Sequence, residues 1–502
     1  MLFDTIMIIY FAIQKGAGMK HFIGLDIGTS CVKAMLINET EIVNVASFDY
    51  PVSYPHDGWS EQNPEDWFNA SLSAIKHLIE GIDPHTVEAV SFSGQMHGLV
   101  TLNENDNVIR PAILWNDGRS AAETDYLNNE VGKDFLLDNT GNIAFPGFTA
   151  PKILWMHNNE KDRFDRIHKI CLPKDYVAYK LSGVFATDVS DAAGTLYFDT
   201  KNRCWSKPML DLLKINESML PNVFESYESV GCIKREIADA LGLRDDVKVV
   251  IGAGDNAASA IGTGAISDGD CNISLGTSGT VFVLSDNYCC DRNNAIHSFC
   301  SANGKYHYLA CILSAASCQK WWIEDILNTG YDFEPLKKYI GNSRVMFLPY
   351  LMGERSPIND SKIRGAFFGL SADTAKEEMT VSVLEGVAFA LKQNIDIIRS
   401  LGVNIKKSKV CGGGARNRLW LEILASVLKI ELQIPVLEHG GVLGAAMLAA
   451  ENCLSSDEYG KMENEFYKTS ETIIPNENLA AYYNEKYNKF LKIYPTIKNM
   501  EV

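Results

Sequence analysis

The tripeptide Gly28-Thr29-Ser30 recurs in the second half of the chain as Gly276-Thr277-Ser278. Each copy stands between two apolar runs rich in β-branched residues, a pattern typical of a β-hairpin. Glycine lets the backbone approach an anion closely, while main-chain N–H groups and the hydroxyls donate hydrogen bonds without adding negative charge. One such turn is more often only a turn than a ligand site. Two copies, half a chain apart, predict a nucleotide site between two related domains.

The chain has 502 residues, and single hydrophobic cores seldom grow beyond roughly 250–300 residues, so we expect two or more domains. Its 46% apolar and 22% charged residues are typical of a soluble globular protein. The formal net charge of −17 argues against nucleic acid and against an anionic membrane as partners. A small phosphorylated ligand is compatible with that charge, because a glycine loop binds it locally.

The 12 cysteines are scattered between Cys31 and Cys453, and none of them forms a Cys-x-x-Cys motif. Their spacing gives no sign of a zinc site or a redox motif, and it favours reduced thiols in the cytoplasm. The apolar stretch 6–13 is too short to span a bilayer, and Asp4 stands where a signal peptide needs basic residues. We expect residues 1–18 to lie outside the fold, with Met19 as a candidate initiator.

The apolar pattern predicts strands and helices mixed in both halves of the chain. The elements expected in the first half are three strands within 22–48, a helix over 65–78 and a strand over 87–93. Those expected in the second half are a strand over 247–251, hairpins around 276, a helix over 314–326, a strand over 345–348, a helix over 375–400, and a strand, glycine turn and helix over 409–428. The expected domains are therefore 19–245 and 246–502.

Eight motifs, spread from about Phe22 to Ala450, resemble those of the FGGY carbohydrate kinases in family order. They are Asp26–Ser30, Ser93–Gly98, Ile113–Arg119, Pro146–Lys152, Leu172–Tyr176, Ser190–Thr195, Gly254–Ala258 and Cys411–Asn417. Motifs this numerous are highly specific. The resemblance implies an α/β fold of two actin-like (ribonuclease H-like) domains with an interdomain cleft.

The resemblance also implies the reaction. The two domains would close on ATP and a ketopentose, and the γ-phosphoryl group would pass to the terminal hydroxyl of the sugar with the help of Mg2+. Residues 19–245 would form the sugar-binding side and residues 246–502 the ATP-binding side. The expected partners are a small-molecule sugar and ATP, with no nucleic acid and no membrane, and a homodimer is left open.

Phosphoryl transfer needs a group that accepts the alcohol proton, a metal that neutralises the triphosphate, and donors that hold it in line. Asp255 follows a strand between Gly254 and Asn256, where a short carboxylate can project into a cleft. From the pattern alone, a base and a cap for the helix that follows are about equally good interpretations. The resemblance favours the base.

Asp26 is a carboxylate within an apolar strand that leads into the first Gly-Thr-Ser turn. We expect it to hold magnesium, through a water molecule, beside the triphosphate. The alternative is an aspartate at a strand end that hydrogen-bonds its own turn.

The segment Ser93–Gly98 is expected to determine the substrate. Gly94 and Gly98 bracket three side chains that could line a small ligand, and methionine among them supplies a polarizable apolar wall. A lone histidine is more often structural than ligand-binding, but the resemblance favours a sugar contact. Asp117-Gly118 reads equally well as a plain turn. The expected substrate-binding residues are Gln95, Met96, His97, Trp115, Asn116, Asp255 and Asn256.

A second glycine turn, Gly412-Gly413-Gly414, lies between a strand and a helix and could seat adenosine against bare backbone. It lacks both the Gly-x-Gly-x-x-Gly spacing and the P-loop ending. Gly444-Ala445-Ala446 is expected within a close-packed helix, and the irregular stretch 437–442 leaves the nucleotide preference open. The expected ATP-binding residues are Gly28, Thr29, Ser30, Lys33, Gly276, Thr277, Ser278, Gly413, Gly414 and Asn417.

The sequence is compatible with three functions. They are a pentulose kinase, a kinase of the same class for another ketose, polyol or sugar acid, and an actin-like ATP-binding protein that signals to a partner. Asp255 together with the Gln95-Met96-His97 segment favours an enzyme, because a signalling ATPase needs no sugar pocket.

Overall fold

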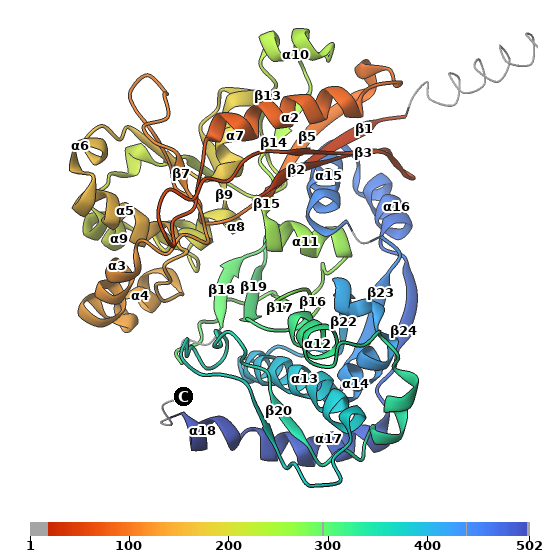
Figure 1. Cartoon of the computed structure of the whole chain (residues 1–502). Coiled ribbons are helices and arrows are strands. Elements are labelled where there is room, and N and C mark those ends of the chain that lie inside the picture. The colour runs from red at the N-terminus through yellow and green to blue at the C-terminus, as the bar shows by residue number, and fades with distance from the viewer. Residues whose placement is uncertain (1–18, 294–295, 438, 499–502) are drawn as a thin grey trace, which may run out of the picture. The chain divides into compact units, whose positions relative to one another are not determined.

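The computed structural model describes residues 19–293, 296–437 and 439–498, so the expectations for residues 1–18 lie outside it. The chain forms two compact units (Figure 1). The first unit comprises the described residues up to Gly264, together with Phe299–Lys305 and His439–Tyr467. The second unit comprises Ala265–Ser298, Tyr306–Glu438 and the residues from Lys468 on.

The boundary expected between residues 245 and 246 falls inside the first unit. Strands β14 (Lys248–Val250) and β15 (Ala253–Gly254) pair with β5 (Val87–Gly94), so the residues after 246 complete the first sheet. A late segment of the chain also returns to this unit as helix α15 (Gly440–Cys453), which contacts β1 (His21–Ile27) and β5. The units are therefore assembled from segments that are distant in sequence.

The first sheet has the strand order β13-β14-β5-β1-β2-β3, with β15 beside β5. Strands β1, β2 (Cys31–Ile37) and β3 (Ile42–Asp49) form the antiparallel run expected within 22–48, and β1 lies parallel to β5. Strand β13 (Ser229–Cys232) is antiparallel to β14 at the other edge.

Helices α2 and α15 cover opposite faces of this sheet. Ile23, Leu25 and Ile27 of β1 belong to one buried cluster with side chains of α2 (Pro64–Leu78). Alternate residues of a strand point to opposite faces, and a Cβ added at Gly24 would lie 2.3 Å from the Val442 carbonyl oxygen of α15. The expected helix over 65–78 is confirmed, and the Asn63 side chain caps it by accepting the Glu65 N–H.

The second sheet has the order β18-β19-β17-β16-β22-β23-β24. Strands β16 (Cys271–Leu275) and β17 (Gly279–Ser285) form the hairpin expected around Gly276, and β16 lies parallel to β22 (Lys407–Cys411). The other strands of this sheet are β18 (His297–Cys300), β19 (Tyr306–Ile312), β23 (Glu431–Pro435) and β24 (Thr469–Ile473).

The two sheets repeat one topology. In each, a hairpin pairs on one side with a further antiparallel strand and on the other side with two successive parallel strands and an antiparallel edge strand. The two Gly-Thr-Ser turns join the strands of the equivalent hairpins, β1–β2 and β16–β17. The duplicated tripeptide thus marks the same place in two related α/β units.

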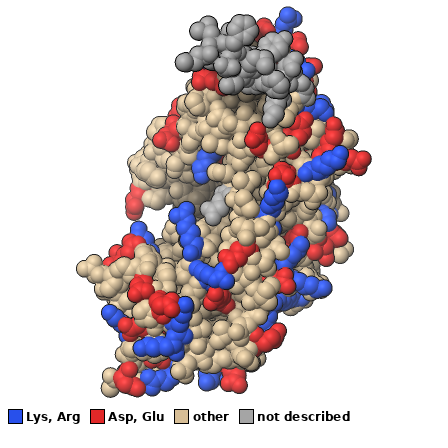
Figure 2. All heavy atoms as spheres, turned by 90° about the vertical axis from the view of Figure 1, so that its right-hand side faces the viewer, with Lys and Arg blue, Asp and Glu red and all other residues tan. Residues whose placement is uncertain are grey.

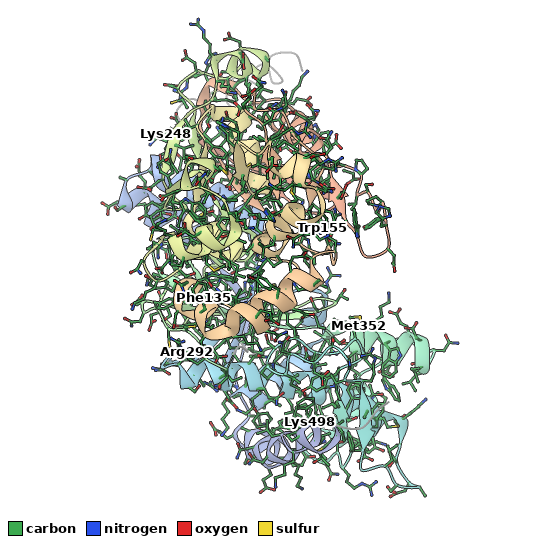
Figure 3. All side chains as sticks on the ribbon, turned by 90° about the vertical axis from the view of Figure 1, so that its left-hand side faces the viewer. Phe135, Trp155, Lys248, Arg292, Met352 and Lys498 are labelled. Atoms are coloured by element: carbon green, nitrogen blue, oxygen red, sulfur yellow. The ribbon has the colours of Figure 1, made fainter. Side chains whose placement is uncertain are left out.

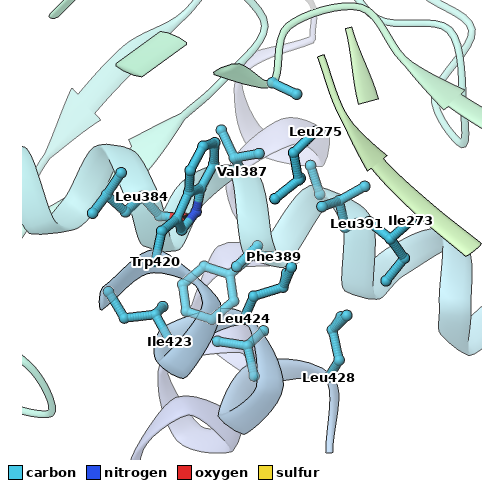
Figure 4. Close-up of a cluster of buried hydrophobic side chains, with 14 of the residues drawn as sticks. Ile273, Leu275, Leu384, Val387, Phe389, Leu391, Trp420, Ile423, Leu424 and Leu428 are labelled. Carbon is cyan, nitrogen blue, oxygen red and sulfur yellow. Dashed lines mark hydrogen bonds between the residues drawn. The ribbon is translucent and has the colours of Figure 1, made fainter. Parts of the chain in front are cut away.

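The core of the second unit lies around Trp420 of α14 (Arg418–Leu428) (Figure 4). The indole is fully buried, and its N–H donates to the Leu384 carbonyl of α13 (Lys376–Ser400) at 3.0 Å. Leu275 from the end of β16 belongs to the same cluster. This packing fixes the strand, glycine turn and helix expected over 409–428 against the second Gly-Thr-Ser turn.

The remaining helices of the first unit are α3 (Ala121–Asp125), α4 (Lys133–Thr140), α5 (Thr149–Asn159), α6 (Lys161–Phe164), α7 (Pro173–Ser182), α8 (Val189–Ala192), α9 (Lys207–Leu213), α10 (Arg235–Leu241), α11 (Asp255–Thr263) and α16 (Ser456–Phe466). Those of the second unit are α12 (Ala316–Lys320), α17 (Glu477–Phe490) and α18 (Ile493–Ile497). The short strands are β4 (Glu61–Gln62), β6 (Val100–Leu102), β7 (Ala112–Ile113), β8 (Lys169–Cys171), β9 (Ala186–Asp188), β10 (Phe198–Asp199), β11 (Cys204–Trp205), β12 (Asn222–Phe224), β20 (Met346–Leu348) and β21 (Ala366–Phe368).

Among the described residues, none of the helices combines the length and the apolar character that crossing a membrane requires. On the face drawn in Figure 2, acidic and basic side chains are interspersed and form no continuous basic patch. All cysteines from Cys31 to Cys453 are free thiols.

Candidate active site

The first Gly-Thr-Ser turn is held by hydrogen bonds to its carbonyl groups. The Tyr50 hydroxyl donates to the Gly28 oxygen at 2.6 Å, and the Gln62 amide donates to the Thr29 oxygen at 2.7 Å. The Gln95 amide donates to the same Gly28 oxygen at 3.2 Å and to Gln62 Oε1 at 3.1 Å. The Gly28 N–H donates to the Asp26 and Cys31 oxygens, and the Thr29 hydroxyl donates to Gln95 Oε1 at 3.4 Å. The N–H groups of Thr29 and Ser30 and the Ser30 hydroxyl are therefore the donors of the turn that can meet an anion.

Asp26 lies at the end of β1 beside this turn. The Ser93 hydroxyl donates to Asp26 Oδ1 at 2.9 Å, and Lys33 is opposite Asp26 on the neighbouring strand. Burial raises the pKa of the Asp26 carboxyl, while the Ser93 hydrogen bond and the Lys33 charge lower it. A Cβ added at Gly441 would lie 3.1 Å from Asp26 Oδ2, so the first turn of α15 packs directly on this carboxylate.

Asp255 is the first residue of α11, directly after β15. Gly254 occupies the N-cap position, and Asp255 Oδ1 accepts hydrogen bonds from the backbone N–H and the side-chain amide of Asn256, at 2.6 and 2.7 Å. Burial raises the pKa of Asp255 to about 7, with the charge of Asp26 as the second cause. A half-buried carboxyl group with a pKa near neutrality is suited to accept a proton at physiological pH.

The three side chains of the expected sugar segment have different surroundings. The Gln95 amide is occupied by the turn and by Gln62, as described above. The Met96 side chain lies against Gly254, since a Cβ added there would be 3.0 Å from Met96 Sδ. His97 has a left-handed backbone (φ 67°), and its Nδ1 lies 2.7 Å from the Gly194 oxygen. The segment is thus next to the residue that precedes Asp255.

Trp115 and Asn116 are exposed, as a ligand contact requires, and Trp115 Nε1 donates to the Thr29 hydroxyl at 3.0 Å. Asp117 differs from them. It is buried, and its carboxylate accepts hydrogen bonds from the Ser60 N–H at 2.6 Å and from the Arg119 guanidinium at 2.7 and 2.8 Å. Asp117 therefore stabilises the turn.

The second unit contains a pocket of about 680 Å³ next to the other Gly-Thr-Ser turn. Five expected ATP-binding residues line it: Gly276, Thr277, Gly413, Gly414 and Asn417. The sixth residue predicted on this side, Ser278, is half-buried and is not among the lining residues. The first unit brings together Asp26, Thr29, the 95–97 segment, Trp115 and Asp255, and it leaves Ser30 and Lys33 exposed at the edge of that group.

Sequence reasoning missed the other wall of this pocket. It is formed by Ala316, Ser317, Gln319, Lys320, Tyr331, Phe333 and Arg416. The Ser317 hydroxyl donates to the Thr277 oxygen at 2.7 Å, and the start of the expected 314–326 helix was the only signal for this residue. Gln319 Oε1 and Asn417 Nδ2 are buried and have no hydrogen-bond partner within the described residues. A ligand in the pocket could satisfy this amide acceptor and this amide donor.

Magnesium would need oxygen ligands at Asp26. The described residues contain no group of three or more His, Cys, Asp or Glu side chains that could hold a metal ion. One carboxylate fits the way Mg2+ is usually held, with water and substrate phosphates as its other ligands. Asp26 therefore fits magnesium that is bound together with a triphosphate.

Comparison with known proteins gives the class of this chain. The N-terminal domain of the FGGY family of carbohydrate kinases matches residues 21–262, and the C-terminal domain matches residues 271–453. The fold is therefore that of a carbohydrate kinase. The chain belongs to the FGGY family of carbohydrate kinases.

Individual relatives agree with this assignment. A xylulose kinase of Escherichia coli strain K12 is 40% identical over 437 residues, which cover 86% of this chain and 88% of that protein. A crystal structure described as a "xyloylose kinase" from Brucella ovis is 39% identical with a TM-score of 0.89, covering 95% of this chain and 99% of that one. A gluconate kinase from Lactobacillus acidophilus is 27% identical with a TM-score of 0.90, covering 96% and 99%. The predicted α/β fold with two actin-like domains is confirmed.

Proposed function

We propose that this sugar kinase transfers the γ-phosphoryl group of ATP to the terminal hydroxyl of D-xylulose and forms D-xylulose 5-phosphate. The observation that supports this most is Asp255, a half-buried carboxyl group with a pKa of about 7 beside the Met96 and His97 segment. The similarity to xylulose kinases supports the choice of sugar.

In the proposed reaction, the ionised Asp255 carboxylate accepts the proton of the terminal hydroxyl. The hydroxyl oxygen then forms a bond to the γ-phosphorus as the bond to the β,γ-bridging oxygen breaks, and ADP leaves. Phosphoryl transfer of this kind is catalysed mainly by positioning and by electrostatic stabilisation. Magnesium bound with the triphosphate would supply charge neutralisation, and Asp26 would hold it through water.

ATP would be bound by both Gly-Thr-Ser turns and by the pocket of the second unit. Main-chain N–H groups of the turns suit phosphate oxygens. Gln319 Oε1 and Asn417 Nδ2 are an acceptor and a donor that suit the hydrogen-bonding edge of a purine base. The Asn417 orientation is set by its own Oδ1, which accepts a hydrogen bond from the Trp420 backbone N–H at 3.2 Å.

The sugar would meet Met96, His97, Trp115, Asn116 and Asn256, while Gln95 holds the turn. A sugar acid is the second candidate, because a gluconate kinase has a similar fold. Its carboxylate would need a cationic partner, and histidine is the only ionisable base in this set of five. The set therefore favours a neutral ketose.

The test is a panel of ketoses, polyols and sugar acids with ATP consumption measured and each product identified by mass and by the position of its phosphate. We expect D-xylulose to give the highest kcat/KM and a 5-phosphate product. A higher kcat/KM with gluconate or with a polyol would replace D-xylulose as the substrate.

A further inference from the structure

Lys152 is a fully buried lysine in the first turns of α5, within the motif Pro146–Lys152. Its ammonium group donates to the His97 oxygen at 2.9 Å and to the Gly147 oxygen at 2.7 Å. Within the described part of the chain, no carboxylate lies within ion-pair distance of it, in contrast to the buried Lys174, whose Nζ is 2.7 Å from Asp175 and 2.8 Å from Asp188. Two backbone carbonyls are thus the chief partners of a buried cation.

Burial of an ammonium group has a high cost in folding free energy, because the group loses hydration that two carbonyls replace only in part. Burial lowers the pKa of Lys152 to about 7, while the charge of Asp117 raises it and that of Arg119 lowers it. An apolar side chain of similar length would fill the same space without this penalty. Packing alone therefore does not explain why a lysine occupies this position.

The two carbonyls belong to the two segments that are proposed to contact the sugar. The His97 oxygen is in the left-handed residue of the 95–97 segment, and the Thr149 hydroxyl also donates to it, at 3.2 Å. Gly147 packs against the other segment, since a Cβ added there would lie 2.5 Å from the Trp115 oxygen. Lys152 therefore joins the backbone that presents His97 to the backbone behind Trp115.

The helix that carries Lys152 is anchored by its next turn. Trp155, labelled in Figure 3, packs edge-on against Trp59 with ring centroids 5.2 Å apart. The Arg119 guanidinium lies 5.0 Å from the centre of the Trp155 ring. A fixed helix allows the ammonium group to define the distance between the two carbonyls.

We propose that Lys152 is a positioning residue that sets the sugar site by holding the His97 and Gly147 carbonyls together. The inference rests on the proposed sugar contacts of His97 and Trp115. The His97 ring itself packs 4.6 Å from Phe148, next to Gly147, so a shift of either carbonyl would move the imidazole. The nucleotide pocket belongs to the other unit and contains none of these residues.

The test compares Lys152→Met with wild type in steady-state kinetics. We expect KM for D-xylulose to rise by about tenfold or more, as the loss of charged hydrogen bonds predicts, with KM for ATP changed by less than about twofold. Lys180→Met is the matched control, because Lys180 is a half-buried lysine of the same unit that pairs with Glu65 at 2.8 Å. It should leave both KM values unchanged. An unchanged KM for D-xylulose in Lys152→Met, or an equal rise in both KM values, would overturn the proposal.

Thr149→Val covers the case in which Lys152→Met does not fold. Valine keeps the shape of threonine but removes the second donor to the His97 oxygen, so KM for the sugar should rise by about two- to threefold at constant KM for ATP. A Thr149→Val enzyme with unchanged KM for the sugar would then contradict the proposal. If wild type prefers another sugar, the proposed substrate is wrong, and the same comparison with that sugar still tests Lys152.

Discussion

At the scale of single residues, Asp26 and Asp255 interact through like charges within one unit. The charge of Asp26 is the second cause, after burial, of the raised pKa of Asp255. A base works in its ionised form, so kcat/KM should rise with pH and level off above about 7. The charge of Asp26 thus influences the proton affinity of Asp255.

Asp26→Asn should move the acid limb, the pH range over which kcat/KM rises, to lower pH, because removal of a like charge lowers the pKa of Asp255. The shift is measured from the pH profile of the residual kcat/KM at saturating magnesium. Asp57→Asn, a change at an exposed residue, is the control and should leave the limb in place. A limb that stays near pH 7 in Asp26→Asn would show that the two acids are not coupled.

Asp255 should also make the protein less stable at alkaline pH. Its pKa is raised from 3.8 to about 7 in the folded state, so folded chains hold this proton more tightly than unfolded ones. The free energy of unfolding therefore falls as pH rises from 3.8 to about 7. Asp255→Asn should raise Tm relative to wild type at pH 8, and the gain should shrink towards pH 4. Equal Tm values for both proteins at pH 8 would contradict the burial of this carboxyl group.

At the scale of elements, α11 and α15 approach closely because both present glycine at their contact. A Cβ added at Gly444 would lie 1.8 Å from the Ala258 oxygen. Gly444→Ala should lower stability by about 1–3 kcal/mol, since the helices must move apart. Thermal or denaturant unfolding measures the change.

Gly460 provides the matched control for that substitution. It lies inside α16, and a Cβ added there meets nothing within 4 Å. Gly460→Ala should therefore raise stability by about 0.5–1 kcal/mol through helix propensity. A loss of stability in both variants would show that the effect of Gly444→Ala does not come from the helix contact.

Elements with a strong apolar period or a clear cap were predictable from the sequence. The helix expected over 375–400 is Lys376–Ser400, and the hairpin around Gly276 is β16–β17. The domain boundary was wrong, because α15 returns to the first unit from far along the chain and no local pattern reveals such a contact. Tyr331 and Phe333 were missed because they lie in a loop without periodicity.

Within the candidate site, the sequence could predict those residues whose position follows from a neighbouring strand or turn. The Gly-Thr-Ser turns and Asp255 stand at strand ends, where sequence shows them. Gln62 and Lys152 act on the site through contacts with Gln95 and His97 that only folding brings together. Their roles could not be derived from spacing.

At the scale of the whole molecule, each unit has its own sheet; the proposed sugar contacts lie in the first unit, and the nucleotide pocket lies in the second. A ligand that binds only the folded state stabilises it by about 2.7 kcal/mol at 100 times its Kd, so each ligand should raise Tm separately. Gly413 lines the nucleotide pocket, and a Cβ added there meets nothing within 4 Å. Gly413→Leu should fill the pocket, abolish the rise in Tm with ATP and keep the rise with D-xylulose.

His97→Ala is the reciprocal variant. It should lose the rise in Tm with D-xylulose and keep the rise with ATP, because His97 belongs to the first unit. If Gly413→Leu lost both responses, or kept its response to ATP, the assignment of the nucleotide to the second unit would be wrong.

The central claim is that Asp255 accepts the proton of the sugar hydroxyl. It is tested most directly by phosphorylation of D-xylulose by wild type and by Asp255→Asn at pH 8, with ligand affinities measured by calorimetry. We predict that kcat of Asp255→Asn falls by about 100-fold or more, as expected for loss of a general base, while Kd for ATP and D-xylulose stays close to wild type. An Asp255→Asn enzyme that turns over D-xylulose at the wild-type rate would contradict the account.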